Sequence, residues 1–124
     1  MKLRHAALRC SSEKNSDKFY KRLLGLKKSD PKSLARALSK AIFGVDSELS
    51  IINYLDENVH FEIFITSHPG NSDGRIEHLC LEVEDLGVFL KKCHDQGVDV
   101  SQIPRGDRTL TFIRDFDGNL FEIK

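Results

Sequence analysis

The sequence has no excess of charge of either sign and no long apolar run. Its 19 lysine and arginine residues balance 19 aspartate and glutamate residues, so the formal net charge is zero and no global field draws the chain to nucleic acid or an anionic membrane. No apolar run approaches the roughly 20 residues that a membrane helix needs, and the first residues lack the apolar core of a signal peptide. We therefore expect a cytoplasmic protein with a small-molecule partner, and neither nucleic acid nor membrane.

The cysteines are few and widely spaced: Cys10, Cys80 and Cys93 are odd in number and form no C-x-x-C motif. This pattern fits reduced thiols in a cytosol better than a disulfide framework. A chain of 124 residues, 40% hydrophobic and 31% charged, can bury one core but not two independent ones. The sequence predicts one domain or two fused half-domains.

What the chain does contain is one order of elements used twice. The pattern His-x-x-Leu occurs in an apolar run at residues 5–8 and again at residues 78–81, and each run is typical of a strand. The tripeptide Phe-Glu-Ile occurs at residues 61–63 and again at residues 121–123, each time after turn residues. Each tripeptide is therefore predicted to be the returning strand of a hairpin.

The repeat predicts two related modules within a single domain. The first covers residues 1–66 and the second residues 75–124. The stretch of residues 67–74 between them is the longest segment rich in glycine, proline and serine, so it is predicted to be the linker.

Each module also carries the start and stop signals of a helix. Ser16 is the expected N-cap of a helix that Gly25 ends, and Asp85 is the expected N-cap of a helix that Gly97 ends. The apolar residues at helical spacing are Phe19, Tyr20 and Leu23 in the first helix, and Leu86, Phe89, Leu90 and Cys93 in the second.

Three strand-like segments follow each helix, which makes the common unit a strand, a helix and three strands in an α+β fold. They lie near Leu26, at Leu49 to Leu55 and at Val59 to Ile65 in the first module, and at Val98 to Ser101, Thr109 to Arg114 and Leu120 to Lys124 in the second. The first module has an insert near residues 31–43, in which Leu34, Leu38 and Ile42 recur every four residues and predict an extra short helix.

Strand alternation turns both histidines of the repeat, His5 and His78, away from the core face, and it gives Glu62 and Glu122 equivalent places in the returning strands. If two equivalent sheets curl toward each other, these residues form a site with two histidines and two carboxylates, which suits zinc or nickel and leaves positions for water or substrate. Taken singly, each is more simply a half-exposed histidine or a solvated carboxylate. Their symmetric occurrence favours a metal site.

Several segments resemble the vicinal oxygen chelate superfamily: His5 with the following Ala-Ala-Leu-Arg, residues 19–26, and residues 115–118 with Glu122. The set His5, Glu62, His78 and Glu122 is similar to the metal ligands of bacterial glyoxalase I, also called lactoylglutathione lyase. The resemblance implies two tandem βαβββ modules that form a curved mixed sheet around a metal cleft, and a homodimer.

The activity implied by this resemblance is a divalent-metal-dependent lyase or isomerase reaction. It converts the hemithioacetal of an α-ketoaldehyde and a thiol, glutathione or another, into a 2-hydroxyacyl thioester through an enediolate. Glu122 is the implied proton shuttle, with Glu62 as its symmetric alternate. Arg9, Arg105 and Arg108 are the implied contacts to the anionic group of the substrate, although each is otherwise an ordinary surface arginine.

Other functions known on this scaffold remain open. Acyl-CoA epimerases typically have a glutamine where Glu62 stands, and ring-cleaving dioxygenases and the thiol transferases that inactivate fosfomycin use only three protein ligands. A metal-free binding protein of the bleomycin-resistance kind keeps the cleft and loses the ligands. Thr66 replaces the asparagine by which glyoxalase I holds glutathione, which leaves the identity of the thiol open.

Overall fold

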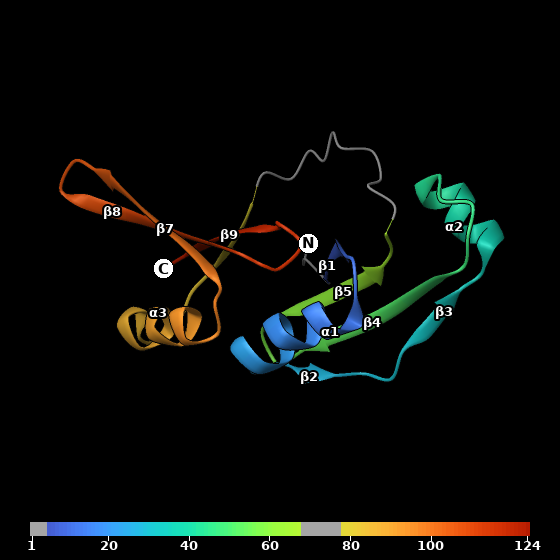
Figure 1. Cartoon of the computed structure of the whole chain (residues 1–124), viewed down its shortest axis with the longest axis horizontal. Helices are drawn as coiled ribbons and strands as arrows, with labels where there is room; N and C mark the ends of the chain where they lie inside the picture. The colour runs from blue at the N-terminus through green and yellow to red at the C-terminus, as the bar shows by residue number, and fades with distance from the viewer. Residues whose placement is uncertain (1–4, 68–77) are drawn as a thin grey trace. The chain divides into compact units, whose positions relative to one another are not determined.

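The computed structural model describes residues 5–67 and 78–124 and divides into two compact units, Met1–Asp73 and Gly74–Lys124 (Figure 1). Each unit has its own mixed sheet with at least one helix, so the predicted α+β fold with two βαβββ modules is confirmed. Of the predicted linker at residues 67–74, all but Ser67 lies outside the described residues. None of the described helices is long and apolar enough to cross a membrane.

The first unit has a five-stranded sheet in the order β1-β5-β4-β2, with β3 also paired to β4. The strand β1 runs parallel to β5, and the other pairs are antiparallel. The elements of this unit are β1 (Ala6–Cys10), α1 (Glu13–Ser16), the π-helix η1 (Asp17–Leu23), β2 (Lys27–Lys28), β3 (Lys32–Leu34), α2 (Arg36–Phe43), β4 (Leu49–Leu55) and β5 (His60–Ile65).

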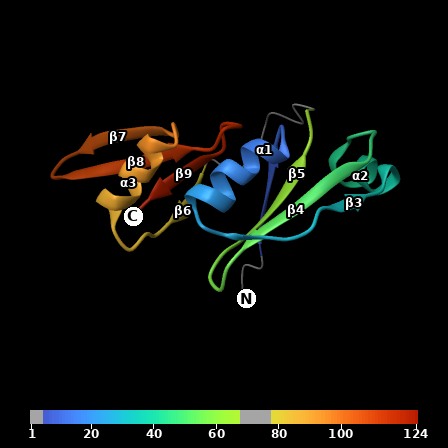
Figure 2. The same ribbon diagram turned by 60° about the horizontal axis from the view of Figure 1, so that its bottom comes forward.

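The second unit repeats this arrangement in a four-stranded sheet with the order β6-β9-β8-β7. Again the first strand, β6, runs parallel to the last, β9. Figure 2 shows α3 lying beside the long hairpin of β7 and β8, and α3 contacts β7. The elements are β6 (Leu79–Leu81), α3 (Leu86–Asp95), β7 (Asp99–Arg105), β8 (Arg108–Arg114) and β9 (Leu120–Ile123).

The first helix begins one turn earlier than predicted. Ser12, in an extended conformation, is the N-cap, and its side chain accepts a hydrogen bond from the backbone N–H of Asn15. The predicted cap Ser16 is instead buried inside the helix, where its hydroxyl donates to the carbonyl oxygen of Ser12. Two serines four residues apart compete for the same role, and the one that follows the strand directly takes it. Gly25 ends the helical segment with a φ of 74°, as predicted.

The helix α3 agrees more closely with its prediction. The Oδ1 atom of Asp85 accepts a hydrogen bond from the backbone N–H of Val88 at 2.9 Å, and Gly97 has a φ of 68°. Phe89 and Cys93 are buried, and burial raises the pKa of the Cys93 thiol to about 11. Leu86 does not join them: it is 36% exposed, because it lies in the first turn, beyond the contact with the sheet.

The insert forms a strand and a helix rather than one short helix. Leu34 belongs to β3, pairs with Leu49 of β4 and packs against buried core residues. The predicted extra short helix is present as α2, on which Leu38 is 53% exposed. Leu34 and Leu38 are four residues apart but do not lie on one face of a helix. The hydrogen-bonded pairing of β3 with β4 outweighs the local helical pattern at Leu34.

Aromatic side chains from the helix and the sheet fill the core of the first unit. The ring of Tyr20 lies 5.3 Å from that of Tyr54 on β4 and 5.4 Å from that of Phe61 on β5, with both partners buried. The hydroxyl of Tyr54 donates to Asp17 at 2.8 Å, and Lys28 also donates to Asp17, at 2.8 Å. One carboxylate thus ties η1 to two strands of the sheet.

We expect Asp17→Asn to destabilise the first unit by about 1 kcal/mol at neutral pH, because charged hydrogen bonds to Lys28 and Tyr54 are lost. Burial disfavours the ionised carboxylate, but the hydrogen bonds from Lys28 and Tyr54 and the charge of Lys28 outweigh it and lower the pKa of Asp17. A lowered folded-state pKa adds stability above the unfolded-state value of about 4, and this stability is lost as the pH falls through the folded-state pKa.

Urea unfolding of wild type and variant at pH 7 and at pH 3 measures both effects. The difference between the two proteins should shrink at pH 3. Asp46→Asn is the matched control, because Asp46 makes two ion pairs at the surface, with Arg36 and Lys40, and its loss should change little. An unchanged difference at pH 3 would show that the charge of Asp17 does not carry the effect.

Candidate metal centre

A turn that begins with aspartate sets the position of each glutamate. Asp56 follows β4, and its Oδ1 accepts hydrogen bonds from two backbone N–H groups of the turn, at 2.7 and 2.8 Å. Asp115 follows β8 and accepts two in the same way, at 3.0 and 2.8 Å. Each turn returns the chain as a strand that carries the sequence Phe-Glu-Ile, with Glu62 in β5 and Glu122 in β9. The turn chemistry therefore fixes which face each glutamate occupies.

In the first unit, the parallel pairing of β1 with β5 brings His5 beside Glu62. Ala7 is the direct partner of Glu62 across the two strands, and His5 lies two residues earlier on the same face. The Nε2 atom of His5 is 3.6 Å from Oε2 of Glu62. The side chains are 44% and 27% exposed, respectively, so both donor atoms can be reached from solution.

The second unit repeats this geometry at equivalent positions. Cys80 is the direct partner of Glu122, and His78 lies two residues before Cys80. The Nε2 atom of His78 is 3.5 Å from Oε2 of Glu122. Lys124 directly follows β9, with its Nζ 3.4 Å from the other carboxylate oxygen of Glu122. Cys80 itself is exposed.

Both separations suit two ligands of one ion better than a hydrogen bond, whose usual length is 2.7 to 3.2 Å. Ligand atoms about 2.1 Å from a divalent ion, at a tetrahedral angle, lie about 3.4 Å apart. Each pair therefore has the nitrogen and oxygen donors, the spacing and the exposure that fit a divalent metal. Within residues 5–67 and 78–124 no group of three or more such ligands occurs, so the four predicted residues are present as two pairs, one in each unit.

The two pairs have different neighbours. In the first unit the ring of His60 lies 5.4 Å from that of His5, and Nε2 of His60 is 2.8 Å from the side-chain oxygen of Asn53. In the second unit the ring of Phe112 lies 5.6 Å from that of His78, nearly perpendicular to it. Sequence reasoning gave His60 no role, although its alternation with Glu62 placed it on the same face. The sequence does not reveal the register between β4 and β5, which places Asn53 within hydrogen-bonding distance of His60.

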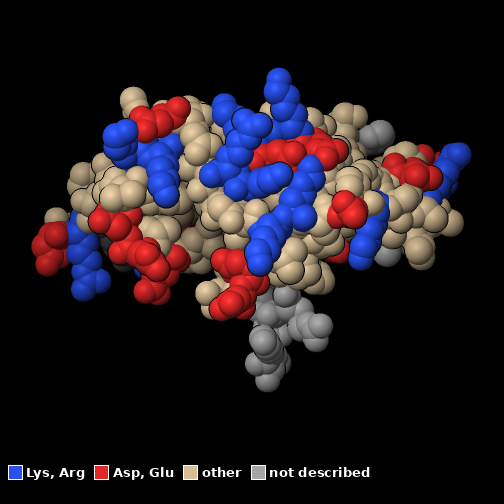
Figure 3. All heavy atoms as spheres, turned by 90° about the horizontal axis from the view of Figure 1, so that it is seen from below, with Lys and Arg blue, Asp and Glu red and all other residues tan. Residues whose placement is uncertain are grey.

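The three predicted anion contacts lie in different places. Arg9 lines a pocket of about 190 Å³ in the first unit. Arg108 lines a pocket of about 660 Å³ in the second unit, together with Glu122 and Lys124. Arg105 ends β7, and its side chain is outside the described part of the chain. On the face in Figure 3, basic and acidic side chains are interspersed rather than gathered by sign.

Solved structures of similar fold include proteins of two named kinds. A glyoxalase family protein from Enterococcus faecalis has 19% sequence identity, with 98% of this chain and 95% of that chain covered and a TM-score of 0.73. A fosfomycin resistance protein, FosX, from Listeria monocytogenes, complexed with Mn(II) and dihydroxypropylphosphonic acid, has 14% identity, coverage of 98% and 87%, and a TM-score of 0.70. At these identities the likeness establishes the fold alone.

The family comparison covers almost the whole chain, because residues 2–123 match the sequence model of one superfamily. No curated protein matches the sequence. The repeated module and the mixed sheet in each unit agree with this match. The chain belongs to the Glyoxalase/Bleomycin resistance protein/Dioxygenase superfamily.

Proposed function

We propose that the chain is a divalent-metal-dependent lyase of the glyoxalase I kind, in which His5, Glu62, His78 and Glu122 ligate one metal ion. The observation that carries the proposal is the repetition of a His–Glu pair at the same strand register, with separations of 3.6 and 3.5 Å. A pair that arose by chance in one module would have no reason to recur in the other at the same spacing.

The substrate would be the hemithioacetal of an α-ketoaldehyde with glutathione or another thiol, and the product a 2-hydroxyacyl thioester. A divalent ion bound by these ligands would stabilise the negative charge that develops on the substrate oxygens. Glu122 would take the proton from the carbon that bears sulfur and return it to the neighbouring carbon. Glu62 is the symmetric alternate for this step.

The surroundings of Glu122 support its choice as the base. Its side chain is 14% exposed, against 27% for Glu62, and its direct neighbours across the sheet are Phe112 and Cys80. Glu62 has Asn53 in the place of Phe112. A carboxylate that is less exposed to water is the better placed to exchange a proton with a carbon acid.

Opening of the epoxide of an organic phosphonate by water is the second candidate reaction: the water oxygen would bond to one epoxide carbon, the C–O bond of that carbon would break, and the product would be a diol. Arg108 and Lys124 line the same pocket as Glu122. Two cationic side chains beside a proposed metal ligand could bind a phosphonate group as well as the carboxylate group of a thiol co-substrate. Arg108 begins β8 and Lys124 directly follows β9, two strands of the second unit that Figure 1 shows. Similarity of fold to a fosfomycin resistance protein makes fosfomycin itself the substrate to try.

The test is to purify the protein without a histidine tag, measure its zinc, nickel and manganese, and assay the reconstituted forms. We expect one divalent ion for each set of four ligands and metal-dependent formation of thioester from methylglyoxal and glutathione or another thiol. Light scattering in the same preparation tests the homodimer that we also propose. If the protein neither carries nor takes up divalent metal, the proposed metal-dependent activity is wrong. Turnover of fosfomycin in place of the hemithioacetal would favour the second candidate reaction.

A further inference from the structure

Each donor histidine lies one residue before the first strand of its unit. His5 precedes β1 and His78 precedes β6, and their side chains are 44% and 39% exposed, respectively. A half-exposed imidazole at the end of a strand can exchange rotamers unless a neighbour packs against it. The position of the donor nitrogen therefore depends on the side chain beside each ring.

In the first unit this neighbour is His60. The parallel register pairs Ala6 with Phe61, and its continuation by one residue sets His5 opposite His60. The two ring centroids are 5.4 Å apart, with the ring planes at 58°, as expected of side chains opposite each other on one face of a sheet. In the part of the chain that the structure describes, no three potential metal ligands come close enough to hold one ion. His60 therefore supports the donor pair rather than completing it.

A hydrogen bond holds the ring of His60 itself. Its Nε2 atom lies 2.8 Å from Oδ1 of Asn53 on β4. An amide oxygen can only accept a hydrogen bond, so Nε2 of His60 carries the hydrogen and donates it. Asn53 is also the direct partner of Glu62 across β4 and β5. One polar contact thus connects the side chain that packs on His5 to the strand position beside the other donor.

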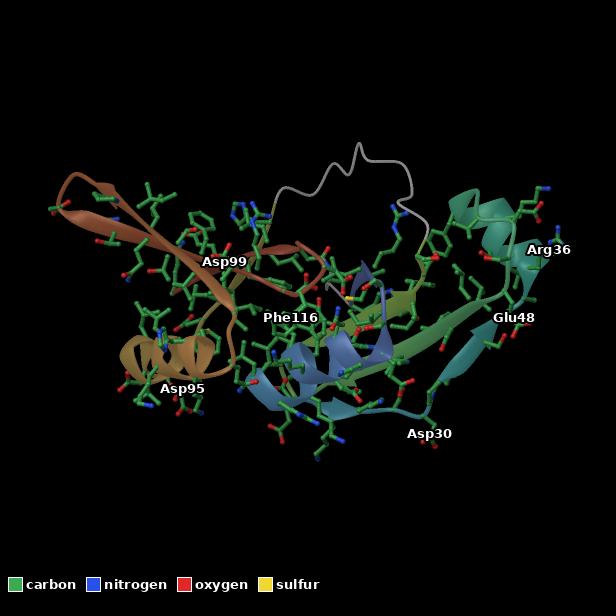
Figure 4. All side chains as sticks on the ribbon, viewed as in Figure 1. Asp30, Arg36, Glu48, Asp95, Asp99 and Phe116 are labelled. Atoms are coloured by element: carbon green, nitrogen blue, oxygen red, sulfur yellow. The ribbon has the colours of Figure 1, made fainter. Side chains whose placement is uncertain are left out.

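The second unit supports its histidine with one side chain instead of two. Phe112 is the direct partner of Glu122, and its ring lies 5.6 Å from that of His78, nearly perpendicular to it. Leu120, two residues before the glutamate, stands where the first unit has its anchored histidine. Figure 4 shows the turn with Phe116 that joins β8 to β9, the strands of these residues. In both units, therefore, an aromatic ring of the sheet packs on the donor histidine, but it comes from a different position.

We propose that His60, anchored by Asn53, is a positioning residue that holds the imidazole of His5 in place before an ion binds. Ligands that are already in place bind more tightly, because less conformational freedom is lost on binding. Neighbours that orient a metal-ligating histidine typically contribute about 10- to 100-fold to metal affinity. This inference rests on the proposed function for the role of His5 as a ligand.

The experiment measures zinc or nickel affinity by competition with a chromophoric chelator. We expect His60→Leu to weaken binding about tenfold, the low end of the range for such neighbours. Asn53→Leu should weaken it less, because the ring of His60 remains beside His5. The double variant with His60→Leu and Asn53→Phe copies the arrangement of Leu120 and Phe112 in the second unit, and it should recover most of the loss.

A measurement without metal separates the positioning from the proposed activity. NMR of the histidine side chains in the metal-free protein should show the hydrogen of His60 on Nε2 in wild type, and this preference should be lost in Asn53→Leu. The ring signals of His5 should shift in His60→Leu. His94→Leu is the matched control: it makes the same change at a side chain that is 91% exposed in the other unit, so it should alter neither metal affinity nor the His5 signals.

Unchanged metal affinity in His60→Leu, together with unchanged ring signals of His5, would overturn the inference. A loss of affinity as large as that in His5→Ala would also overturn it, since His60 would then be a ligand itself. If the wild type binds no metal, the proposed function is rejected. In that case a shift of the His5 signals in metal-free His60→Leu would still support the positioning, and its absence would overturn it.

Discussion

We expect His78→Ala to lower the affinity of the protein for zinc or nickel by about 100-fold or more. Its Nε2 atom is one of the two donors of the second pair, and even an indirect neighbour of a metal ligand typically contributes 10- to 100-fold to affinity. Competition with a chromophoric chelator measures the dissociation constant directly. The matched control is His94→Ala, whose side chain is 91% exposed on α3 in the same unit and which should leave metal affinity unchanged.

The same measurement on His5→Ala decides whether the two pairs hold one ion together. If four ligands share one ion, either variant weakens the whole site, and the wild type binds one ion for each set of four. If each pair holds an ion of its own, the wild type binds two, and each variant loses only one. That second outcome, or an unchanged affinity in both variants, would contradict the proposed metal centre.

If the proposed lyase activity is correct, we expect Glu122→Gln to lower kcat for the hemithioacetal by about 10²- to 10⁴-fold at saturating metal, the usual contribution of a general base. The amide keeps an oxygen that can still face the ion, but it cannot accept the proton, and it also binds the metal more weakly than a carboxylate. Assays at a series of metal concentrations separate the two effects, because only the loss of affinity is recovered by adding metal.

Glu62→Gln should reduce kcat less than Glu122→Gln, because Glu122 has the drier surroundings. Glu84→Gln, an exposed glutamate before α3, is the control for the charge change. A larger loss in Glu62→Gln would assign the base to the first unit. Equal activity of all three variants and wild type would show that neither glutamate moves the proton.

Local signals in the sequence were sufficient for much of the fold. Asp85 caps α3, and Gly25 and Gly97 end their helices with positive φ, because capping and left-handed turns depend on a few neighbouring residues. The repeat of His-x-x-Leu and Phe-Glu-Ile located both modules, and in each module the tripeptide pairs in parallel with the first strand, β1 in one and β6 in the other.

Where two local signals competed, the sequence could not choose between them. Ser12 and Ser16 are both good N-caps, and only the end of β1 at Cys10 places Ser12 in the extended conformation that a cap needs. Leu34 fitted a helical spacing, but its pairing with Leu49 on a strand 15 residues later draws it into the sheet. Such pairings depend on the whole sheet and leave no local trace.

The sequence by itself determined the repeated module, the turns and the four residues that could bind metal, because alternation and turn chemistry act over a few residues. Only the tertiary structure brought His5 to Glu62, set Asn53 against His60, and laid Phe43 over Phe64. These contacts join residues far apart in the chain, or depend on strand register and the docking of α2, which the packing of the whole unit decides.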